Sequence, residues 1–300
     1  MQFKRTKRAI NGVLLLDKPA GYSSNQALQA VKRLYQAAKA GHTGSLDPLA
    51  TGLLPICLGE ATKFSHFLLD ADKSYRAAIK LGATTTTGDA EGEVLQTLPV
   101  QVSEQQLQAV LQQLTGPISQ VPPMYSALKH QGKALYEYAR DGIEIPREAR
   151  NVTIHALQLN RFDGVELDVD VHCSKGTYIR TLAEDIGELL GCGAHLIALR
   201  RLTTAHFKLE DAIALEALEA LEAEQRDAEL LPPDAPLEAL PSVKVDEESA
   251  FYLLRGQEVW KSGLSLTGTF RIYSGSRFLG IGEQTHQGRI APRRLIVEKT

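Results

Sequence analysis

Apolar and polar residues alternate with a two-residue period along two segments, which is the pattern of a β-strand with one buried face. The alternation runs through residues 165–173 and through residues 74–81, where Tyr75 lies on the apolar side. Residues 13–17 form a short continuous apolar run, typical of a buried strand. Residues 195–207 have the composition of a further strand pair or extended segment. These four segments predict the main strands.

Apolar residues recur at helical spacing in other segments, which begin or end at capping residues. Ser24 is the expected N-cap of one helix. Ser103 and Gln106 form a capping box in front of a second helix. A third helix ends at Gly191, and an acidic helix is predicted over residues 211–224.

Two stretches divide the chain. Residues 121–150 are rich in Pro, Gly, Tyr and basic residues and have weak periodicity, so we expect a long excursion from the core. The proline-rich residues 231–236 are the predicted domain boundary. Short strands separated by turn glycines follow, and this spacing suggests a small β-barrel of about 55–60 residues.

The charge of the chain is unevenly distributed. The formal net charge of −3 argues by itself against a nucleic-acid partner. Residues 210–248, however, contain thirteen acidic and two basic residues, a local charge of −11, so the remainder carries +8. A positive body can present a basic face to a polyanion, whereas scattered solvated charge is the alternative that composition leaves open.

Several classes of protein are disfavoured by the sequence. No apolar stretch approaches the roughly 20 residues of a membrane-spanning helix, and no apolar signal core follows the basic residues 1–8, which are suited to contact phosphate. Cys57, Cys173 and Cys192 form no Cys-x-x-Cys pair, so buried reduced thiols fit better than disulfides or a zinc ribbon. Because no phosphate-cradling glycine loop is present, nucleotide triphosphates are not expected. We expect a cytoplasmic protein.

Candidate chemistry is concentrated in two segments. Residues 41–52 place Asp47 among glycines, a proline and apolar neighbours. An Asp before a Pro is usually a turn former, and the alternative is a carboxylate held for catalysis. Residues 175–180 offer Tyr178 and Arg180, which are either a core ring and a surface charge or parts of a site. If Arg180 meets Asp47, its planar fork can hold the carboxylate in one orientation.

Other candidates have two interpretations each. Tyr75 is either a half-buried strand tyrosine or a platform on which a base stacks. His42 is a solvated loop histidine, a general base or a ring that stacks with RNA. Gly88 and Gly92 accompany the acidic cluster of Asp89, Glu91 and Glu93, which favours a solvent-exposed turn over a cation site.

Four motifs, taken in order and spacing, resemble one known family. They read LDKPAG at residues 16–21, GHTGSLDP at 41–48, KSY at 73–75 and GTYIR at 176–180. Together they are similar to the TruB family of bacterial tRNA pseudouridine-55 synthases, over about residues 9–210. Ser23 and Ser45 stand where many members carry Thr, and both keep the hydroxyl. The tail, about residues 243–294, looks like the PUA-type RNA-binding barrel often appended to these enzymes.

The resemblance implies three catalytic residues. Asp47 matches the catalytic aspartate and Arg180 the arginine that pairs with it. Tyr75 matches the tyrosine that stacks on the target uracil and takes part in the final proton removal. We expect Asp47 to be ionised, because its ordinary pKa is about 3.9 and pairing with Arg180 favours the charged form.

The resemblance also implies substrate-binding residues. Tyr178 and Leu199 match residues that line the uridine pocket. His42 matches the histidine that inserts into the T-loop, and Lys18 matches a residue that supports the site. Residues 121–150 match the mobile element that closes over the T-loop.

The implied fold is α+β. A catalytic domain over residues 1–230 would contain a central mixed, mostly antiparallel sheet flanked by helices, and a PUA-like barrel would occupy residues 240–300. The implied reaction converts uridine 55 in the T-loop of tRNA to pseudouridine, with the base flipped out and Asp47 as the carboxylate. Neither redox change nor phosphate energy is needed, so no cofactor and no metal are expected. The expected enzyme is a monomer that binds the T-arm without a guide RNA, a protein partner or a membrane.

Three alternatives compete with this interpretation. The first is a non-catalytic RNA-binding protein of the same fold. The second is the RNA-guided branch of the same superfamily, which works inside a multi-protein particle. The third is a metal-dependent hydrolase built on His42 and Asp47, for which a third ligand is not apparent in the sequence.

Overall fold

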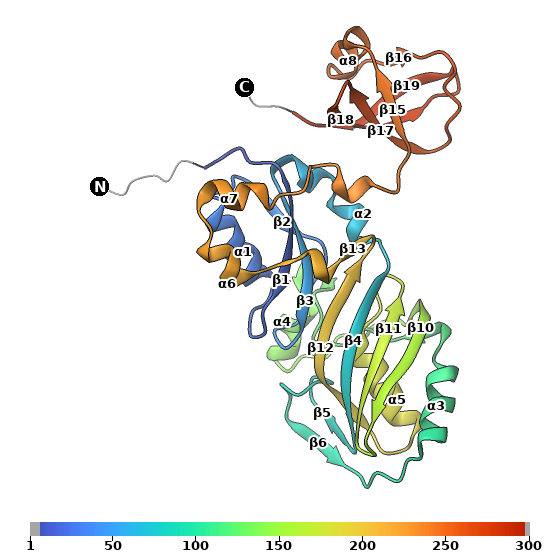
Figure 1. The fold of residues 1–300 in the computed structure, drawn as a ribbon. Coiled ribbons are helices and arrows are strands. Elements are labelled where there is room, and N and C mark those ends of the chain that lie inside the picture. Colours follow the sequence, from blue (N-terminus) through green and yellow to red (C-terminus); the bar gives the residue numbers. More distant parts are fainter. Residues whose placement is uncertain (1–6, 298–300) are drawn as a thin grey trace.

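A ten-stranded sheet forms the core of the computed structural model, which describes residues 7–297 (Figure 1). Its strand order is β14-β1-β3-β12-β4-β11-β10-β7, with β13 beside β12 and β2 beside β3. The strands are β1 (Gly12–Lys18), β2 (Ala40–His42), β3 (Thr51–Leu58), β4 (Lys73–Leu81), β7 (Gly116–Gln120), β10 (Arg150–Phe162), β11 (Glu166–Cys173), β12 (Ala194–Thr204), β13 (Phe207–Lys208) and β14 (Ile213–Ala214). The β1–β14 and β3–β12 pairs are parallel and the other pairs are antiparallel, which confirms the mixed, mostly antiparallel sheet.

Helices flank this sheet, as predicted. They are α1 (Ser24–Leu34), α2 (Ser65–Leu69), α3 (Glu104–Gln113), α4 (Leu135–Arg140), α5 (Ile179–Leu189), α6 (Leu215–Ala220) and α7 (Ala223–Ala228). In Figure 1, α5 lies behind the sheet, where it contacts β4 and β12, and α3 lies beside β10; the buried face of β4 forms part of the core. The predicted alternation of β4 is confirmed, because Tyr75 and every second residue after it are buried.

Two local predictions need correction. Ser23, and not Ser24, is the N-cap of α1, and it forms a capping box with Gln26. The side chain of Ser24 is instead buried and bonds to the backbone of Leu46. The acidic helix predicted over residues 211–224 is wrong as a single helix, because Leu221 has the extended dihedral angles φ −73° and ψ 147° and separates α6 from α7. The capping box at Ser103 is confirmed.

The excursion over residues 121–150 leaves the sheet between β7 and β10. It contains a two-stranded hairpin, β8 (Lys129–His130) with β9 (Lys133–Ala134), followed by α4. A second hairpin, β5 (Ala83–Thr85) with β6 (Val94–Thr97), extends from the end of β4. The excursion is anchored by buried side chains, including Ser126 and Leu135.

The C-terminal segment forms a separate five-stranded sheet with the order β15-β17-β18-β19-β16. Its elements are β15 (Ser242–Val245), α8 (Glu247–Leu253), β16 (Val259–Trp260), β17 (Thr269–Ser274), β18 (Arg277–Gln284) and β19 (Arg289–Leu295). This sheet is a half-barrel with its own apolar core, so the predicted small β structure is confirmed but the closed PUA-like barrel is not. The end of that prediction, residues 298–300, lies outside the described residues.

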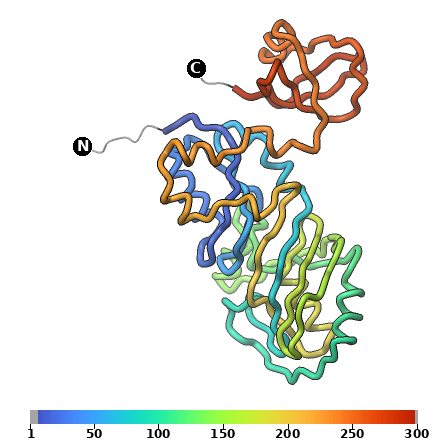
Figure 2. Tube along the Cα trace, viewed as in Figure 1, coloured from blue at the N-terminus to red at the C-terminus, as the bar shows by residue number. Residues whose placement is uncertain are grey.

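The half-barrel lies beyond one end of the large sheet, as the chain trace in Figure 2 makes clear. Phe64 is fully buried there against Phe278, with their ring centroids 5.5 Å apart. Lys63 Nζ donates to the carbonyl of Leu295 at 2.7 Å, and Arg294 donates back to the carbonyl of Lys63 at 3.0 Å. This contact joins the half-barrel to the segment that leads into α2.

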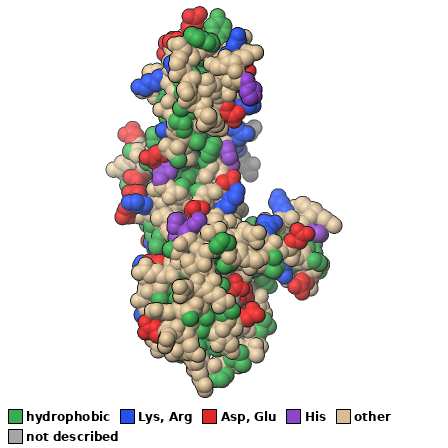
Figure 3. All heavy atoms as spheres, turned by 90° about the vertical axis from the view of Figure 1, so that its right-hand side faces the viewer, with side chains coloured by type: hydrophobic (Ala, Val, Ile, Leu, Met, Phe, Trp, Pro, Cys, Tyr) green, Lys and Arg blue, Asp and Glu red, His purple; other side chains and the backbone are tan. Residues whose placement is uncertain are grey.

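Charged side chains of both signs are interspersed along the side of the molecule shown in Figure 3, so the predicted basic face is not apparent there. Most of the basic N-terminal arm, residues 1–6, lies outside the described part of the chain. Among residues 7–297 no helix has the length and apolar character needed to cross a membrane.

Candidate active site

The loop that carries Asp47 connects β2 to β3 and is fixed by buried hydrogen bonds. Ser24 Oγ accepts a hydrogen bond from the amide of Leu46 at 2.7 Å and donates one to the carbonyl of Leu46 at 3.1 Å. On the other side, the amide and hydroxyl of Thr43 both donate to the carbonyl of Pro55 at 3.2 Å. A loop with its polar groups satisfied in this way holds its side chains in one arrangement.

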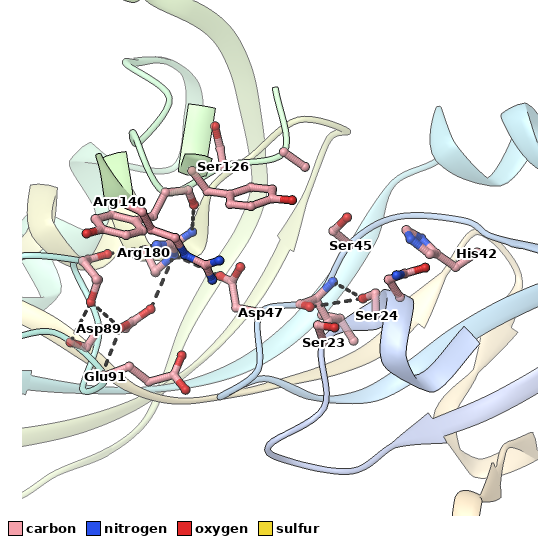
Figure 4. A pocket seen from close by; sticks show the side chains of 16 residues that line it. Ser23, Ser24, His42, Ser45, Asp47, Asp89, Glu91, Ser126, Arg140 and Arg180 are labelled. Carbon is pink, nitrogen blue, oxygen red and sulfur yellow. Dashed lines mark hydrogen bonds and ion pairs between the residues drawn. The ribbon is translucent and has the colours of Figure 1, made fainter. Parts of the chain in front are cut away.

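Asp47 and Arg180 meet as predicted, although 133 residues of sequence separate them. Arg180 Nε lies 3.0 Å from Asp47 Oδ2. The arginine side chain is 6% exposed, whereas the aspartate side chain exposes 41% of its surface to the cavity. Figure 4 shows the two groups facing each other. A planar guanidinium in contact with a carboxylate fixes the orientation of that carboxylate.

Asp89 belongs to the same cluster, so its interpretation as part of an exposed turn was wrong. Its side chain is 4% exposed and one oxygen lies 3.7 Å from Arg180 Nε. The other oxygen accepts hydrogen bonds from the Thr87 hydroxyl and the Glu91 amide. Asp89 is buried because its backbone forms a β-bridge with Leu196 of β12. This contact is non-local, so a local sequence pattern cannot predict it.

Arg180 is held by more than its carboxylates. Its two terminal nitrogens donate to the carbonyl of Thr87 at 3.0 Å and to that of Tyr125 at 2.5 Å. The excursion over residues 121–150 is therefore tied directly to the Asp47 ion pair through Tyr125.

The pKa of Asp47 is raised above its ordinary value, mainly because burial disfavours the carboxylate. The charge of Arg180 opposes this shift, the charge of Asp89 adds to it, and Lys18 opposes it more weakly. We expected pairing with Arg180 to favour ionisation. Arg180 acts in that direction, but desolvation outweighs it.

Two adjoining recesses open on either side of Asp47, and both are lined by Asp47 and Arg180. One, the acidic recess, has a volume of about 500 Å³ and is also lined by Asp89, Glu91 and His42. The other, the basic recess, has a volume of about 380 Å³. Its further lining includes Lys73, Tyr75, Tyr178, Leu199 and Arg201. Both volumes are in the range of small-molecule sites.

The predicted pocket residues therefore come together in the basic recess. Tyr75 reaches it from β4 and Leu199 from β12, while Tyr178 immediately precedes α5. The amide of Tyr178 donates to Gln120 Oε1 of β7 at 3.0 Å, which fixes the backbone at that position. Rings and an aliphatic side chain around a carboxylate form a cavity that can accept a flat, polar molecule.

Lys18 and His42 occupy different positions from these residues. Lys18 is fully buried and lines neither recess; its Nζ donates to the carbonyls of Pro19 and Tyr22. Burial lowers the pKa of Lys18 to about 8. Such a residue supports the turn from behind. His42 opens into the acidic recess, and in Figure 4 its ring lies well away from Arg180.

His42 has the character of a neutral ring. Its Nδ1 is buried with no hydrogen-bond partner in the structure. Burial lowers the pKa of His42, and the charge of Arg201 lowers it further. Within residues 7–297, no three His, Cys, Asp or Glu side chains are grouped in a way that could hold a metal ion.

Arg201 is a lining residue that the sequence analysis did not name, and Lys73 appeared there only as part of the KSY motif. Arg201 is 1% exposed and Lys73 is 8% exposed. Lys73 Nζ donates to three backbone carbonyls near the end of α2, and burial lowers its pKa to about 8. The one signal for Arg201 was its spacing of two residues from Leu199 on a predicted strand, which places both on one face.

Comparison with known families covers nearly the whole chain. Residues 32–179 match the family described as TruB family pseudouridylate synthase (N terminal domain). Residues 180–240 match the tRNA pseudouridylate synthase B C-terminal domain, and residues 241–296 match pseudouridine synthase II TruB, C-terminal.

Similar curated proteins agree with these matches. The chain is 70% identical over 297 residues to tRNA pseudouridine synthase B of Methylobacillus flagellatus, covering 99% of this chain and 98% of that protein. It is 54% identical over 307 residues to tRNA pseudouridine synthase B of Escherichia coli strain K12, covering 98% of each.

Solved structures have the same fold. A structure described as an H/ACA RNP bound to a substrate RNA containing 2'-deoxyuridine matches with a TM-score of 0.71 and 23% identity, over 96% of this chain and 85% of that chain. A Cbf5-Nop10-Gar1 complex matches with a TM-score of 0.70 and 26% identity, over 96% and 84%. With the full-length identities above, these findings establish that the chain belongs to the TruB family of tRNA pseudouridine synthases, which are isomerases.

Proposed function

We propose that this enzyme isomerises uridine 55 in the T-loop of tRNA to pseudouridine and that Asp47 is its catalytic carboxylate. The observation that carries the proposal is the 3.0 Å contact between Asp47 and Arg180 in a recess that Tyr75, Tyr178 and Leu199 also line. A carboxylate that is held in one orientation beside a cavity of this size can act on the ribose or the base of a single nucleoside.

The target base must leave the loop of the tRNA before it can enter this recess. Base flipping costs a few kcal/mol of lost stacking, and new contacts in the site offset that cost. Tyr75 is suited to stack on the flipped uracil, since stacking between a base and an aromatic ring contributes about 1–3 kcal/mol. Tyr178 and Leu199 would enclose the base. Lys18 would support the site by holding the turn that follows β1, through its hydrogen bonds to the carbonyls of Pro19 and Tyr22.

The rest of the T-loop would be bound around the acidic recess. His42 is a neutral ring that can stack with bases of the opened T-loop. Such stacking does not depend on base identity, because every base presents a flat π-face. Residues 121–150 would close over the T-loop, and the bond from Arg180 to the Tyr125 carbonyl would transmit that closure to the ion pair. The C-terminal half-barrel would bind tRNA outside the active site.

The enzyme acts alone in this proposal, as a cytoplasmic monomer without cofactor, metal or guide RNA. The two solved structures compared above are an H/ACA RNP and a Cbf5-Nop10-Gar1 complex, but their identity to this chain is 23–26%. The proteins that match at 54–70% identity over nearly their whole length are named as tRNA enzymes. This difference favours the stand-alone enzyme over the RNA-guided one.

The test is to incubate the purified protein with an unmodified tRNA transcript and no other RNA or protein, and then to map pseudouridine at single-nucleotide resolution. We expect one modified position, uridine 55. A transcript with cytidine at position 55 is the control and should stay unmodified. Modification elsewhere would overturn the site assignment, and a requirement for added guide RNA would overturn the stand-alone mode.

A further inference from the structure

Arg201 is a buried cation whose charge no carboxylate balances within the described residues. It is 1% exposed. Among residues 7–297 no Asp or Glu forms an ion pair with it, and burial lowers the pKa of the guanidinium while Tyr75 raises it. An unpaired buried charge is costly, so its position beside the reacting base calls for a functional explanation.

The position of the Arg201 guanidinium is fixed from two sides. Its Nε donates to the carbonyl of Leu53 on β3 at 2.6 Å, and one terminal nitrogen donates to the carbonyl of Gly44 in the Asp47 loop at 3.4 Å. The backbone is fixed as well. Gly52 has φ +99°, and a Cβ there would lie 2.3 Å from the Arg201 carbonyl oxygen, so only glycine allows this approach of β3 to β12.

The remaining contact of the guanidinium is with Tyr75. The two residues are register partners on β12 and β4, and both line the basic recess. A guanidinium can only donate, so in a hydrogen bond between the two side chains the Tyr75 oxygen is the acceptor. The hydroxyl hydrogen of Tyr75 is then free to point away from Arg201, and the recess that both residues line is the open space beside it.

Arg201 is also the group that favours ionisation of Tyr75 most strongly. Burial raises the pKa of Tyr75; the nearby charge of Arg201 lowers it, whereas Cys173 and Asp47 raise it. The thiol of Cys173 is itself kept neutral, because burial raises its pKa to about 11.

We propose that Arg201 is a positioning residue for the last step of the reaction. It holds the Tyr75 oxygen toward C5 of the rejoined base, and it stabilises the phenolate form of Tyr75. This inference rests on the proposed function. In that step the C5–H bond breaks and the proton moves to the Tyr75 oxygen. The electron pair forms the C5–C6 double bond, the N1–C6 double bond opens toward N1, and N1 takes a proton from water. The phenolate arises by prior loss of the hydroxyl proton to water, so the net change is one proton moved from C5 to N1.

The experiment compares Arg201→Met, Arg201→Lys and Arg200→Met in single turnovers at saturating enzyme. Arg200 is the matched control, since it is the neighbouring residue on β12 but pairs with Asp17 at 2.7 Å instead of lining either recess. Each variant is given tRNA with hydrogen or deuterium at C5 of the target uridine. A third tRNA carries 5-fluorouridine there, whose C5 has no hydrogen to remove.

Arg201→Met should slow pseudouridine formation on the order of 10²-fold, the usual contribution of proton transfer by a positioned side chain. The C5 deuterium isotope effect should rise well above that of the unsubstituted enzyme, because proton removal becomes rate-limiting. Arg201→Lys should recover part of the rate and lower the isotope effect. Rearrangement of the fluorinated tRNA should proceed at the unsubstituted rate.

An unchanged isotope effect in both Arg201 variants, or an equal slowing with the fluorinated tRNA, would overturn the inference, because Arg201 would then act before proton removal. If Arg201→Met fails to fold, the isotope effect of Arg201→Lys decides the question. That variant retains a cation to which the carbonyls of Leu53 and Gly44 can still bond. Failure of the proposed function is distinguishable: the unsubstituted enzyme would then leave uridine 55 unmodified.

Discussion

Two buried arginines flank Asp47, and their surroundings are opposite in kind. Arg180 contacts two carboxylates, those of Asp47 and Asp89. Arg201 is held by the carbonyls of Leu53 and Gly44 and lies opposite Tyr75 in the register of β12 and β4. A guanidinium can thus be buried with its charge balanced or unbalanced, and only the second arrangement leaves positive potential directed at a nearby group.

This difference separates the tasks of the two arginines. Around Arg180 the opposite charges fix geometry, because an ion pair with further hydrogen bonds has one preferred arrangement. Around Arg201 the excess positive charge lies beside the phenol of Tyr75, which is neutral at rest and would become negative during the reaction. Interactions that strengthen as charge develops are those that accelerate a step.

The largest effect is expected from Asp47→Asn, which removes the charge shared by both recesses. Turnover should fall on the order of 10⁴-fold or more, the scale seen when a central catalytic group is removed, while tRNA binding stays nearly unchanged. Tritium release from C5-labelled tRNA measures the first, and filter binding measures the second. Asp170→Asn is the control, since Asp170 pairs with Arg76 on the exposed sheet face. Retention of most activity would remove Asp47 from its role.

The next largest effect is expected from Arg180→Met, which leaves Asp89 buried without its cation. Breaking a buried ion pair from one side costs about 3–5 kcal/mol, so the free energy of unfolding should fall by that amount. Denaturant unfolding measures it. The double variant Arg180→Met with Asp89→Asn should recover much of the loss, and an equally unstable double variant would show that Asp89 does not depend on Arg180.

How much of this could be predicted from sequence depends on whether the signal is local. The alternation of β4 is local, and it placed Tyr75 on the buried face. The pairing of Asp47 with Arg180 is non-local, and it was predicted by resemblance to a family; the residues alone offered it as one possibility. Asp89 was misjudged because its burial depends on a backbone bridge to Leu196, far away in the sequence.

Arg201 illustrates the second reason for a missed residue. Strand β12 has register irregularities on both sides of residues 198–201, and its burial does not alternate regularly. Hydropathy places an arginine in solvent by default. Only the bulged geometry of β12 and the glycine at position 52 bring this side chain inside.

A smaller effect, on binding rather than chemistry, is expected from deleting the residues after Ala239, which leaves both arginines in place. The tRNA dissociation constant should rise about tenfold, equivalent to roughly 1.4 kcal/mol. The single-turnover rate at saturating enzyme should stay unchanged. Because Phe64 loses its contact with Phe278, thermal unfolding of the truncated protein must be checked in parallel. An equal loss in single-turnover rate would mean that the half-barrel contributes to the recesses.

The smallest expected effect tests whether burial or pairing controls Asp47. Its folded-state pKa is raised above the ordinary 3.8, so the folded protein binds this proton more tightly than the unfolded chain. The charged form therefore costs stability, and the cost grows as pH rises from about 3.8 through the folded-state pKa. Asp47→Asn should accordingly gain stability relative to the unsubstituted enzyme as the pH rises from about 3.8 through the folded-state pKa of Asp47, as measured by urea unfolding at each pH. If the charge of Arg180 outweighed desolvation, the sign would reverse and the substitution would lose relative stability over the same range. The slope alone decides which of the two forces acts more strongly on the carboxylate between the two arginines.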